Sequence, residues 1–244
     1  MVKRPRFLVL SGDGINCERE TAAAVESAGG LSVITHINDF LYEKNRAGLQ
    51  EFQGLCFPGG FSFGDELGSG QIMSLKMKAH LGNDLEEFVA SGKLIIGICN
   101  GFQILAEAGL LPGALLRNVS MKYICKFLYL RTETTDTPYT NLLTKGQLLR
   151  IPIGHGDGNF FAGESTLRRI EDNDQVVFRY ADAEGRITAE ANPNGSLNNI
   201  AGIVNEQRNV LGMMPHPDRS SEEILGSADG KLLFESMVNA LVAG

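Results

Sequence analysis

The chain has 244 residues, of which 43% are hydrophobic and 21% are charged, and its formal net charge is −7. This much apolar sequence can bury one sizeable core, so we expect residues 1–244 to form a single domain. A net negative chain without a basic stripe is not expected to bind nucleic acid.

The N-terminal stretch has one short apolar run, Phe7 to Leu10, before a glycine-rich turn. Such a run is too short for a signal peptide or a membrane span, and we expect a cytoplasmic protein. The four cysteines lack CxxC spacing, which predicts neither a disulfide framework nor a metal site. We expect Cys56 and Cys125 to lie in the core, and Cys17 to be structural or adjacent to a site.

The first part of the chain alternates between predicted strands and helices. The expected strands are 7–10, 32–37, 55–57 and 93–98, and the expected helices are 16–28, with Asn16 as N-cap, and 72–90. This alternation predicts an α/β fold, in which a mostly parallel sheet carries helices on both faces. Ligands of such sheets bind at the carboxyl ends of the strands.

The residue pattern changes between residues 113 and 215, where short apolar runs are separated by turns and helical periodicity is weak. These strand-like runs are 123–130, 147–153, 176–180 and 200–204. They predict an antiparallel extension of the same sheet. Residues 231–242 are apolar at helical spacing, and we expect this helix to close the fold.

The motif Gly97-Ile98-Cys99-Asn100-Gly101 lies between an apolar strand and a predicted helix over 102–108. This order is typical of a nucleophile elbow, in which glycines permit a tight strand-to-helix turn. The helix N-terminus favours a thiolate at Cys99, and the N–H of Asn100 points to where an oxyanion forms. We expect a thiol that is not buried. A buried structural cysteine is the alternative interpretation.

A cysteine nucleophile needs a general base and an orienting group. His216 follows a predicted strand in Met213-Met214-Pro215-His216-Pro217-Asp218, and Asp218 can orient its ring. His155, in a glycine-rich loop, is a candidate for lining the site. Taken alone, the segment around His216 is also compatible with a structural turn.

A third turn, Phe57-Pro58-Gly59-Gly60-Phe61-Ser62-Phe63-Gly64-Asp65, also follows a strand. The N–H groups of its Gly-Gly pair are candidates for the second oxyanion donor. The turn lacks the GK[ST] ending of a nucleotide-binding P-loop.

Together these motifs resemble the class I, triad-type glutamine amidotransferases, and among them the glutaminase subunits of phosphoribosylformylglycinamidine synthases. The resemblance runs nearly end to end and rests on Gly14-Ile15-Asn16-Cys17-Glu18, on residues 57–65, on the elbow, on residues 152–158 and on residues 213–217. It implies a flavodoxin-like sheet extended by antiparallel strands. Asp218 and Asp157 stand where the family usually has glutamate, so Glu222 or Glu223 is an alternative orienting group.

The resemblance also implies roles for the residues. Cys99 attacks the side-chain carbonyl of glutamine, His216 carries the proton, and Asp218 orients the imidazole. The N–H groups of Asn100 and of Gly60 or its neighbour Gly59 hold the oxyanion. The implied substrate-binding residues are Gln103 and His155.

The resemblance further implies partners. Ammonia passes to a larger synthetase subunit, which uses ATP and Mg²⁺ to convert formylglycinamide ribonucleotide to formylglycinamidine ribonucleotide in purine biosynthesis. A small third subunit bridges the two. No cofactor and no metal are expected in this chain.

Two other hypotheses keep the elbow but change the function. One is a DJ-1-like cysteine redox sensor or hydrolase, in which Cys99 cycles through an oxidised state. The other is a binding subunit whose triad has decayed, which Asp218 in place of glutamate makes conceivable.

Overall fold

The computed structural model describes residues 4–42, 46–64, 68 and 70–243. Asp65, at the end of the predicted glycine-rich turn, lies outside the described residues. Within them the chain builds one nine-stranded sheet in the order β2-β1-β3-β4-β11-β10-β9-β6-β7.

The first half of this sheet is parallel, as predicted. Its strands are β2 (Leu31–His36), β1 (Arg6–Ser11), β3 (Gly54–Phe57), β4 (Leu94–Ile98) and β11 (Val210–Met213). Strands β3, β4 and β11 are buried at every position. Continuous apolar runs of this kind are expected where helices cover both faces of a sheet.

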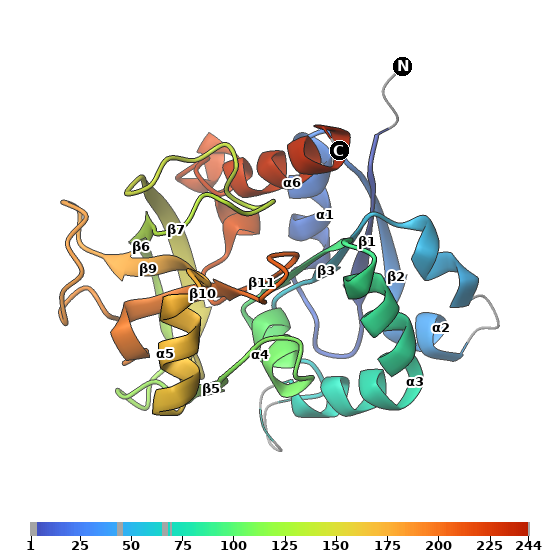
Figure 1. Cartoon of the computed structure of the whole chain (residues 1–244), viewed down its shortest axis with the longest axis horizontal. Helices are drawn as coiled ribbons and strands as arrows, with labels where there is room; N and C mark the ends of the chain where they lie inside the picture. Colours follow the sequence, from blue (N-terminus) through green and yellow to red (C-terminus); the bar gives the residue numbers. More distant parts are fainter. Residues whose placement is uncertain (1–3, 43–45, 65–67, 69, 244) are drawn as a thin grey trace.

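Helices cover both sides of the parallel half (Figure 1). On one side α1 (Glu18–Ser27) packs against α6 (Lys231–Ala243), and on the other α3 (Gln71–Ala90) packs against α4 (Asn100–Glu107). The shorter helix α2 (Ile37–Tyr42) and the 3₁₀ helix η1 (Arg46–Glu51) lie between β2 and β3 along the chain. None of the described helices is long and apolar enough to cross a membrane.

The predicted antiparallel extension is confirmed. Beyond β11 the sheet continues with β10 (Ile200–Val204), β9 (Val176–Ala181), β6 (Ile124–Thr132) and β7 (Leu148–His155), each antiparallel to its neighbour. Strands β5 (Ala114–Leu116) and β8 (Asn159–Phe161) form a separate pair. The short 3₁₀ helices are η2 (Leu197–Asn199), η3 (Pro217–Ser220) and η4 (Glu223–Leu225).

Two local predictions are wrong. Asn16 is not the N-cap of α1, because the helix begins at Glu18 after Cys17. Instead the main-chain N–H groups of Asn16 and Cys17 both donate to the carbonyl oxygen of Gly59. The sequence pattern also missed α5 (Glu164–Asp172), which has two apolar residues, the half-buried Leu167 and the buried Ile170, and is too short for the helical period to repeat.

Candidate active site

Cys99 occupies a strained turn between β4 and α4. Its φ of 52° and ψ of −106° are unusual for a residue with a side chain. The turn packs closely against β3, because a Cβ atom on Gly101 would lie 2.0 Å from the carbonyl oxygen of Phe57. Glycine is therefore required next to the elbow, and the predicted strand–cysteine–helix geometry is present.

The thiol is covered in this conformation. Cys99 is 5% exposed, and its Sγ lies 3.7 Å from the carbonyl oxygen of Gly154. The expectation of a thiol that is not buried is wrong, because strand β7 brings Gly154 across the elbow. In this conformation the sulfur is therefore almost closed off from solvent.

His216 reaches the elbow because β11 runs parallel to β4. The two strands end side by side, with Met213 opposite Ile98, and the N–H of Cys99 donates to the carbonyl oxygen of Met213 at 2.8 Å. The main-chain N–H of His216 in turn donates to Pro152 of β7 at 2.8 Å. Cys99 and His216 thus leave neighbouring strands at the same edge of the sheet.

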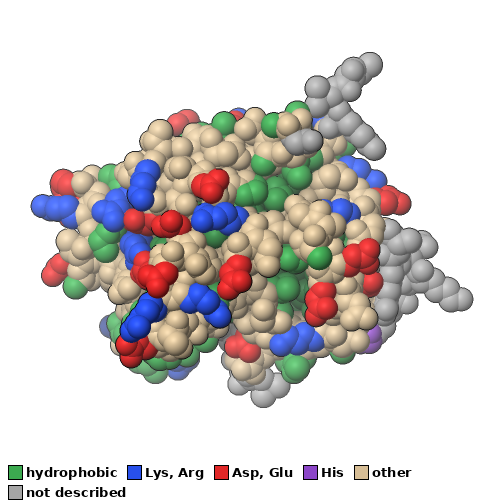
Figure 2. All heavy atoms as spheres, in the orientation of Figure 1, with side chains coloured by type: hydrophobic (Ala, Val, Ile, Leu, Met, Phe, Trp, Pro, Cys, Tyr) green, Lys and Arg blue, Asp and Glu red, His purple; other side chains and the backbone are tan. Residues whose placement is uncertain are grey.

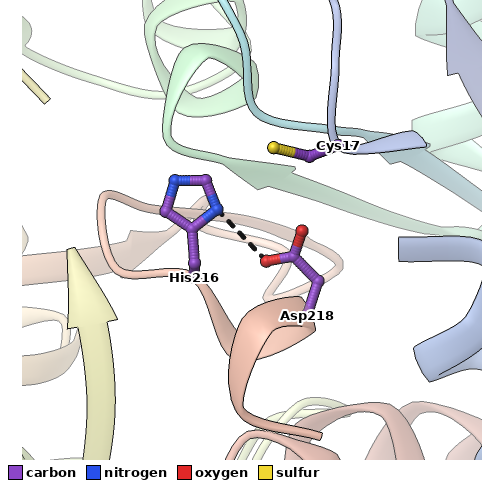
Figure 3. A group of neighbouring side chains, drawn as sticks. All are labelled: Cys17, His216 and Asp218. Atoms are coloured by element: carbon purple, nitrogen blue, oxygen red, sulfur yellow. Dashed lines mark ion pairs between the residues drawn. The ribbon is translucent and has the colours of Figure 1, made fainter. Parts of the chain in front are cut away.

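Asp218 lies beside the ring of His216 (Figure 3). The Nδ1 atom of His216 is 3.3 Å from Oδ1 of Asp218, and both side chains are buried. The distance is that of an ion pair, but neither atom has a partner that meets hydrogen-bond geometry among the described residues. The alternative orienting groups, Glu222 and Glu223, are exposed.

The charges in this group favour a protonated imidazole. Burial opposes the charge on the ring, but the neighbouring Asp218 and Cys99 raise the pKa of His216 well above its usual value. A ring held in this state beside Cys99 suits the general acid and base that a cysteine nucleophile needs.

The turn after β3 packs directly against the histidine. A Cβ atom on Gly59 would lie 2.5 Å from Cε1 of His216, so the ring occupies the space that any side chain here would fill. The next residues are fixed by the N–H of Phe61, which donates to the carbonyl oxygen of Gly14 at 2.7 Å. In the described part of the chain, the N–H groups of Gly60 and Asn100 have no recorded acceptor.

Asn100 and Gln103 link the elbow to the loops around it. The N–H of Ser62 donates to Oδ1 of Asn100 at 3.1 Å, and Nδ2 of Asn100 donates to Oε1 of Gln103 at 2.9 Å. Nε2 of Gln103 donates to the carbonyl oxygen of Asp157 at 2.6 Å. Both amide atoms of Gln103 are therefore engaged within the protein, where they fix the helix to the loop after β7.

His155 is buried at the end of β7. Its Nδ1 lies 3.1 Å from Oδ1 of Asn118, and Nδ2 of Asn118 donates to the carbonyl oxygens of Lys122 and His155. The Asn118 oxygen is therefore the acceptor, which places the His155 proton on Nδ1. Burial, with the nearby His216, lowers the pKa of His155 to about 4, so the ring is neutral.

Cys17, which was expected to be structural or adjacent to a site, lies near His216 and Asp218, together with Arg219 and Thr21, which the sequence did not single out. The sulfur of Cys17 points toward the His216 ring, and the ligand-type atoms of Cys17, His216 and Asp218 lie within 4.8 Å of one another (Figure 3). Nη2 of Arg219 lies 3.0 Å from this sulfur, and its positive charge opposes a metal ion there. Thr21 donates to Oδ2 of Asp218 at 3.3 Å.

No spacing rule connects these groups, because Cys17 and Thr21 lie just before and within α1 while His216 and Asp218 lie near the other end of the chain. The remaining cysteines differ from each other. Cys56 is buried as expected, and burial raises the pKa of its thiol. Cys125 is exposed on β6, so its placement in the core was wrong.

Known proteins resemble this chain along nearly its whole length. The family model described as a CobB/CobQ-like glutamine amidotransferase domain matches residues 4–232. Phosphoribosylformylglycinamidine synthase subunit PurQ of Koribacter versatilis is 48% identical over 97% of this chain and 98% of its own length. The PurQ subunit of Aquifex aeolicus is 45% identical over 96% of this chain and 99% of its own.

Solved structures give the same result. A chain of the PurLQS structure from Thermotoga maritima superposes with a TM-score of 0.81 at 40% identity, covering 98% of this chain and 100% of that one. A glutamine amidotransferase from the same organism shares the fold alone, with a TM-score of 0.62 at 14% identity over 99% of this chain and 100% of its own. The chain belongs to the family of CobB/CobQ-like glutamine amidotransferase domains.

Proposed function

We propose that this protein is the glutaminase subunit of a phosphoribosylformylglycinamidine synthase in purine biosynthesis. It hydrolyses the side-chain amide of glutamine and supplies ammonia to a synthetase subunit. The observation that carries this proposal is the end-to-end similarity to PurQ subunits. The convergence of Cys99 and His216 at the ends of neighbouring strands supplies the chemistry.

In the first half-reaction the sulfur of Cys99 attacks the δ-carbon of glutamine. The thiol proton resides on His216, and the carbonyl oxygen becomes an oxyanion. The N–H groups of Gly60 and Asn100 have no other recorded acceptor among the described residues, so they are suited to bind this oxygen. We assign the oxyanion hole to this pair, with Gly59 leaving room for the imidazole.

The oxyanion then collapses to a glutamyl thioester. The carbon–nitrogen bond breaks, and His216 gives its proton to the departing amine, which leaves as ammonia. Water attacks the thioester with His216 as general base, so that glutamate leaves and the thiol is restored. Asp218 holds the imidazole in the tautomer that faces the sulfur.

We infer that His155 and Gln103 shape the substrate site. The neutral ring of His155 has an unpartnered, buried Nε2 among the described residues, which is suited to accept a hydrogen bond. Gln103 contributes by fixing the loop after β7 over the elbow. Its amide atoms are already bonded, so this role is one of shape rather than of direct contact.

One relative supports a proposal about the partners. The PurLQS structure from Thermotoga maritima contains a chain that superposes on this one over its whole length. We propose that this protein joins a larger synthetase subunit, which uses ATP and Mg²⁺, and a small bridging subunit. In this assembly residues 1–244 act as one domain. The four cysteines are free thiols, which suits the reducing environment of the cytoplasm.

The test is a reconstituted complex with the synthetase and small subunits of the same organism. Cys99→Ala is expected to lower glutamine-dependent amidation by about 10³-fold or more, because the nucleophile is lost. Amidation driven by added ammonium salt is expected to continue at the wild-type rate. A diazoketone analogue of glutamine should label Cys99 and no other cysteine.

Two outcomes contradict the proposal. Equal glutamine-dependent rates in the wild type and Cys99→Ala would leave only a binding role for the chain. Labelling of a different cysteine in the assembled complex would place the glutaminase site elsewhere. The ammonium-driven rate is the control that the complex has assembled correctly.

A further inference from the structure

The first turn of α1 lies against Asp218. Thr21 of this turn is completely buried, and its hydroxyl oxygen lies 3.3 Å from Oδ2 of Asp218. An ionised carboxylate has only acceptor atoms, so the hydroxyl is the donor. A side chain from the start of the chain therefore contacts the orienting carboxylate near its other end.

Asp218 has few other partners. Among the described residues, Thr21 is the one recorded side-chain donor to its carboxylate, and Oδ1 meets no hydrogen-bond geometry despite lying 3.3 Å from Nδ1 of His216. The terminal torsion of an aspartate is soft. The bond to Thr21 therefore determines which carboxylate oxygen faces the imidazole.

The imidazole also has a competing neighbour. Cys17, the residue directly before α1, places its sulfur on the same side of His216 as Asp218 (Figure 3). Arg219 donates to this sulfur, which keeps it beside the ring. If Asp218 turned away, the N–H at Nδ1 would meet the sulfur instead of a carboxylate oxygen, and sulfur is a weak acceptor.

We propose that Thr21 is a positioning residue for the triad and acts through Asp218. Its hydroxyl fixes the carboxylate in the orientation that stabilises the His216 imidazolium, and thereby the thiolate of Cys99. The inference rests on the proposed glutaminase function, and it extends the catalytic arrangement from the strand ends to helix α1.

Two substitutions at position 21 test the role in the reconstituted complex. Thr21→Val keeps the shape but removes the donor, and kcat for glutamine hydrolysis is expected to fall about tenfold, the effect of one charge-assisted hydrogen bond. KM is expected to change by less than about twofold, because Thr21 does not touch glutamine. Thr21→Ser keeps the hydroxyl and is expected to restore kcat to within about threefold of the wild type.

A second measurement does not depend on glutamine turnover. The rate at which iodoacetamide alkylates Cys99 is followed against pH in the full chain, with the modified peptide identified by mass spectrometry. Thr21→Val is expected to move the alkylation midpoint to higher pH, because a poorly held carboxylate stabilises the imidazolium less. Thr21→Ser is expected to follow the wild type.

Thr132→Val is the matched control. Thr132 is also completely buried, but its hydroxyl has no partner among the described residues, so both readouts should stay at wild-type values. Unchanged kcat and an unchanged alkylation midpoint in Thr21→Val would overturn the inference, as would equal losses in Thr21→Ser and Thr21→Val. An inactive wild-type complex with a shifted alkylation midpoint would reject the proposed function and still support the role of Thr21.

Discussion

At Cys99 the main chain adopts a conformation that favours glycine, with φ of 52°. Strain of this kind costs on the order of 1–3 kcal/mol and is found mainly at functional sites. The surrounding contacts sustain it, since Gly97 and Gly101 let the strand, the helix and β3 approach closely. The position of the sulfur is thus obtained at the expense of stability.

This strain gives a prediction at position 99 itself. Cys99→Gly removes the side chain that strains the backbone. The glycine variant is therefore expected to be more stable than Cys99→Ala by about 1 kcal/mol in the free energy of unfolding. This figure already allows for the greater freedom of glycine in the unfolded chain. Urea denaturation of the two inactive variants measures the difference. Equal stability, or a more stable alanine variant, would contradict the strain.

The packing of Gly59 against His216 gives a second prediction. A methyl group there would lie 2.5 Å from Cε1 of the ring, so Gly59→Ala must displace the imidazole. We expect a loss of about 1–3 kcal/mol in unfolding free energy from overpacking. Glutaminase activity should fall at least about tenfold, because the ring leaves its position beside Asp218 and the elbow.

Gly48→Ala is the control for that experiment. A Cβ atom on Gly48 would meet nothing within 4 Å, so the same chemical change should leave activity unchanged. If Gly59→Ala retained wild-type activity, the close approach of turn and ring would not be needed for catalysis. The two variants together separate a packing effect from a general effect of replacing glycine.

At the scale of elements, the site depends on two neighbouring strands being held together. Tyr139, completely buried, places its hydroxyl 2.6 Å from the carbonyl oxygen of Ile95 on β4 and 2.5 Å from that of Asn209, just before β11. The N–H of Ile95 also donates to this oxygen, at 3.2 Å. One phenol thus joins the starts of the strands that end at Cys99 and His216.

Tyr139→Phe removes the hydrogen bonds of the phenol, while the N–H of Ile95 keeps its bond to the carbonyl oxygen of Asn209 at 2.8 Å. We expect a loss of about 1–3 kcal/mol in the free energy of unfolding. Chemical denaturation measures this loss. The control is Tyr129→Phe, at a less buried position of β6, which is expected to change the free energy of unfolding by less than about 0.5 kcal/mol. A similar small effect for Tyr139→Phe would show that the strands do not need this bond.

At the scale of the whole molecule, charge and burial set the response to pH. The protein has a formal net charge of −7. On the face drawn in Figure 2, acidic and basic side chains lie among one another, so neither sign forms a single patch there. Buried groups, whose pKa differs between the folded and unfolded states, are expected to dominate the pH dependence of stability.

His155 is the clearest example. Burial lowers its pKa from 6.5 to about 4. The unfolded chain therefore binds a proton that the folded chain does not, and stability is lost as the pH falls from 6.5 to about 4. This residue alone is expected to account for roughly 3 kcal/mol of that loss.

His155→Asn keeps a donor to Asn118 but cannot titrate. The variant is expected to lose less stability than the wild type between neutral pH and pH of about 4. Urea denaturation at several pH values measures how the free energy of unfolding of each protein changes with pH. The same change in both proteins would mean that His155 is not held neutral by its surroundings.

The sequence predicted the parallel strands well because each is a short apolar run between glycine-rich turns. The same reasoning placed Cys99 and His216 correctly, since parallel neighbours end at one edge of the sheet. It failed for α5, which is too short for the helical period to repeat, and for the N-cap of α1, where tertiary hydrogen bonds to Gly59 override the local preference of Asn16.

The sequence by itself therefore determined the α/β class, the antiparallel extension and the positions of Cys99 and His216 after neighbouring strands. All of these follow from periodicity and from motifs contained in a few consecutive residues. Only the tertiary structure decided the neighbours of the triad: Thr21 on Asp218, Cys17 beside His216, and Gly154 over the sulfur. Contacts between side chains far apart along the chain leave no spacing in the sequence, because their distance depends on how whole elements pack.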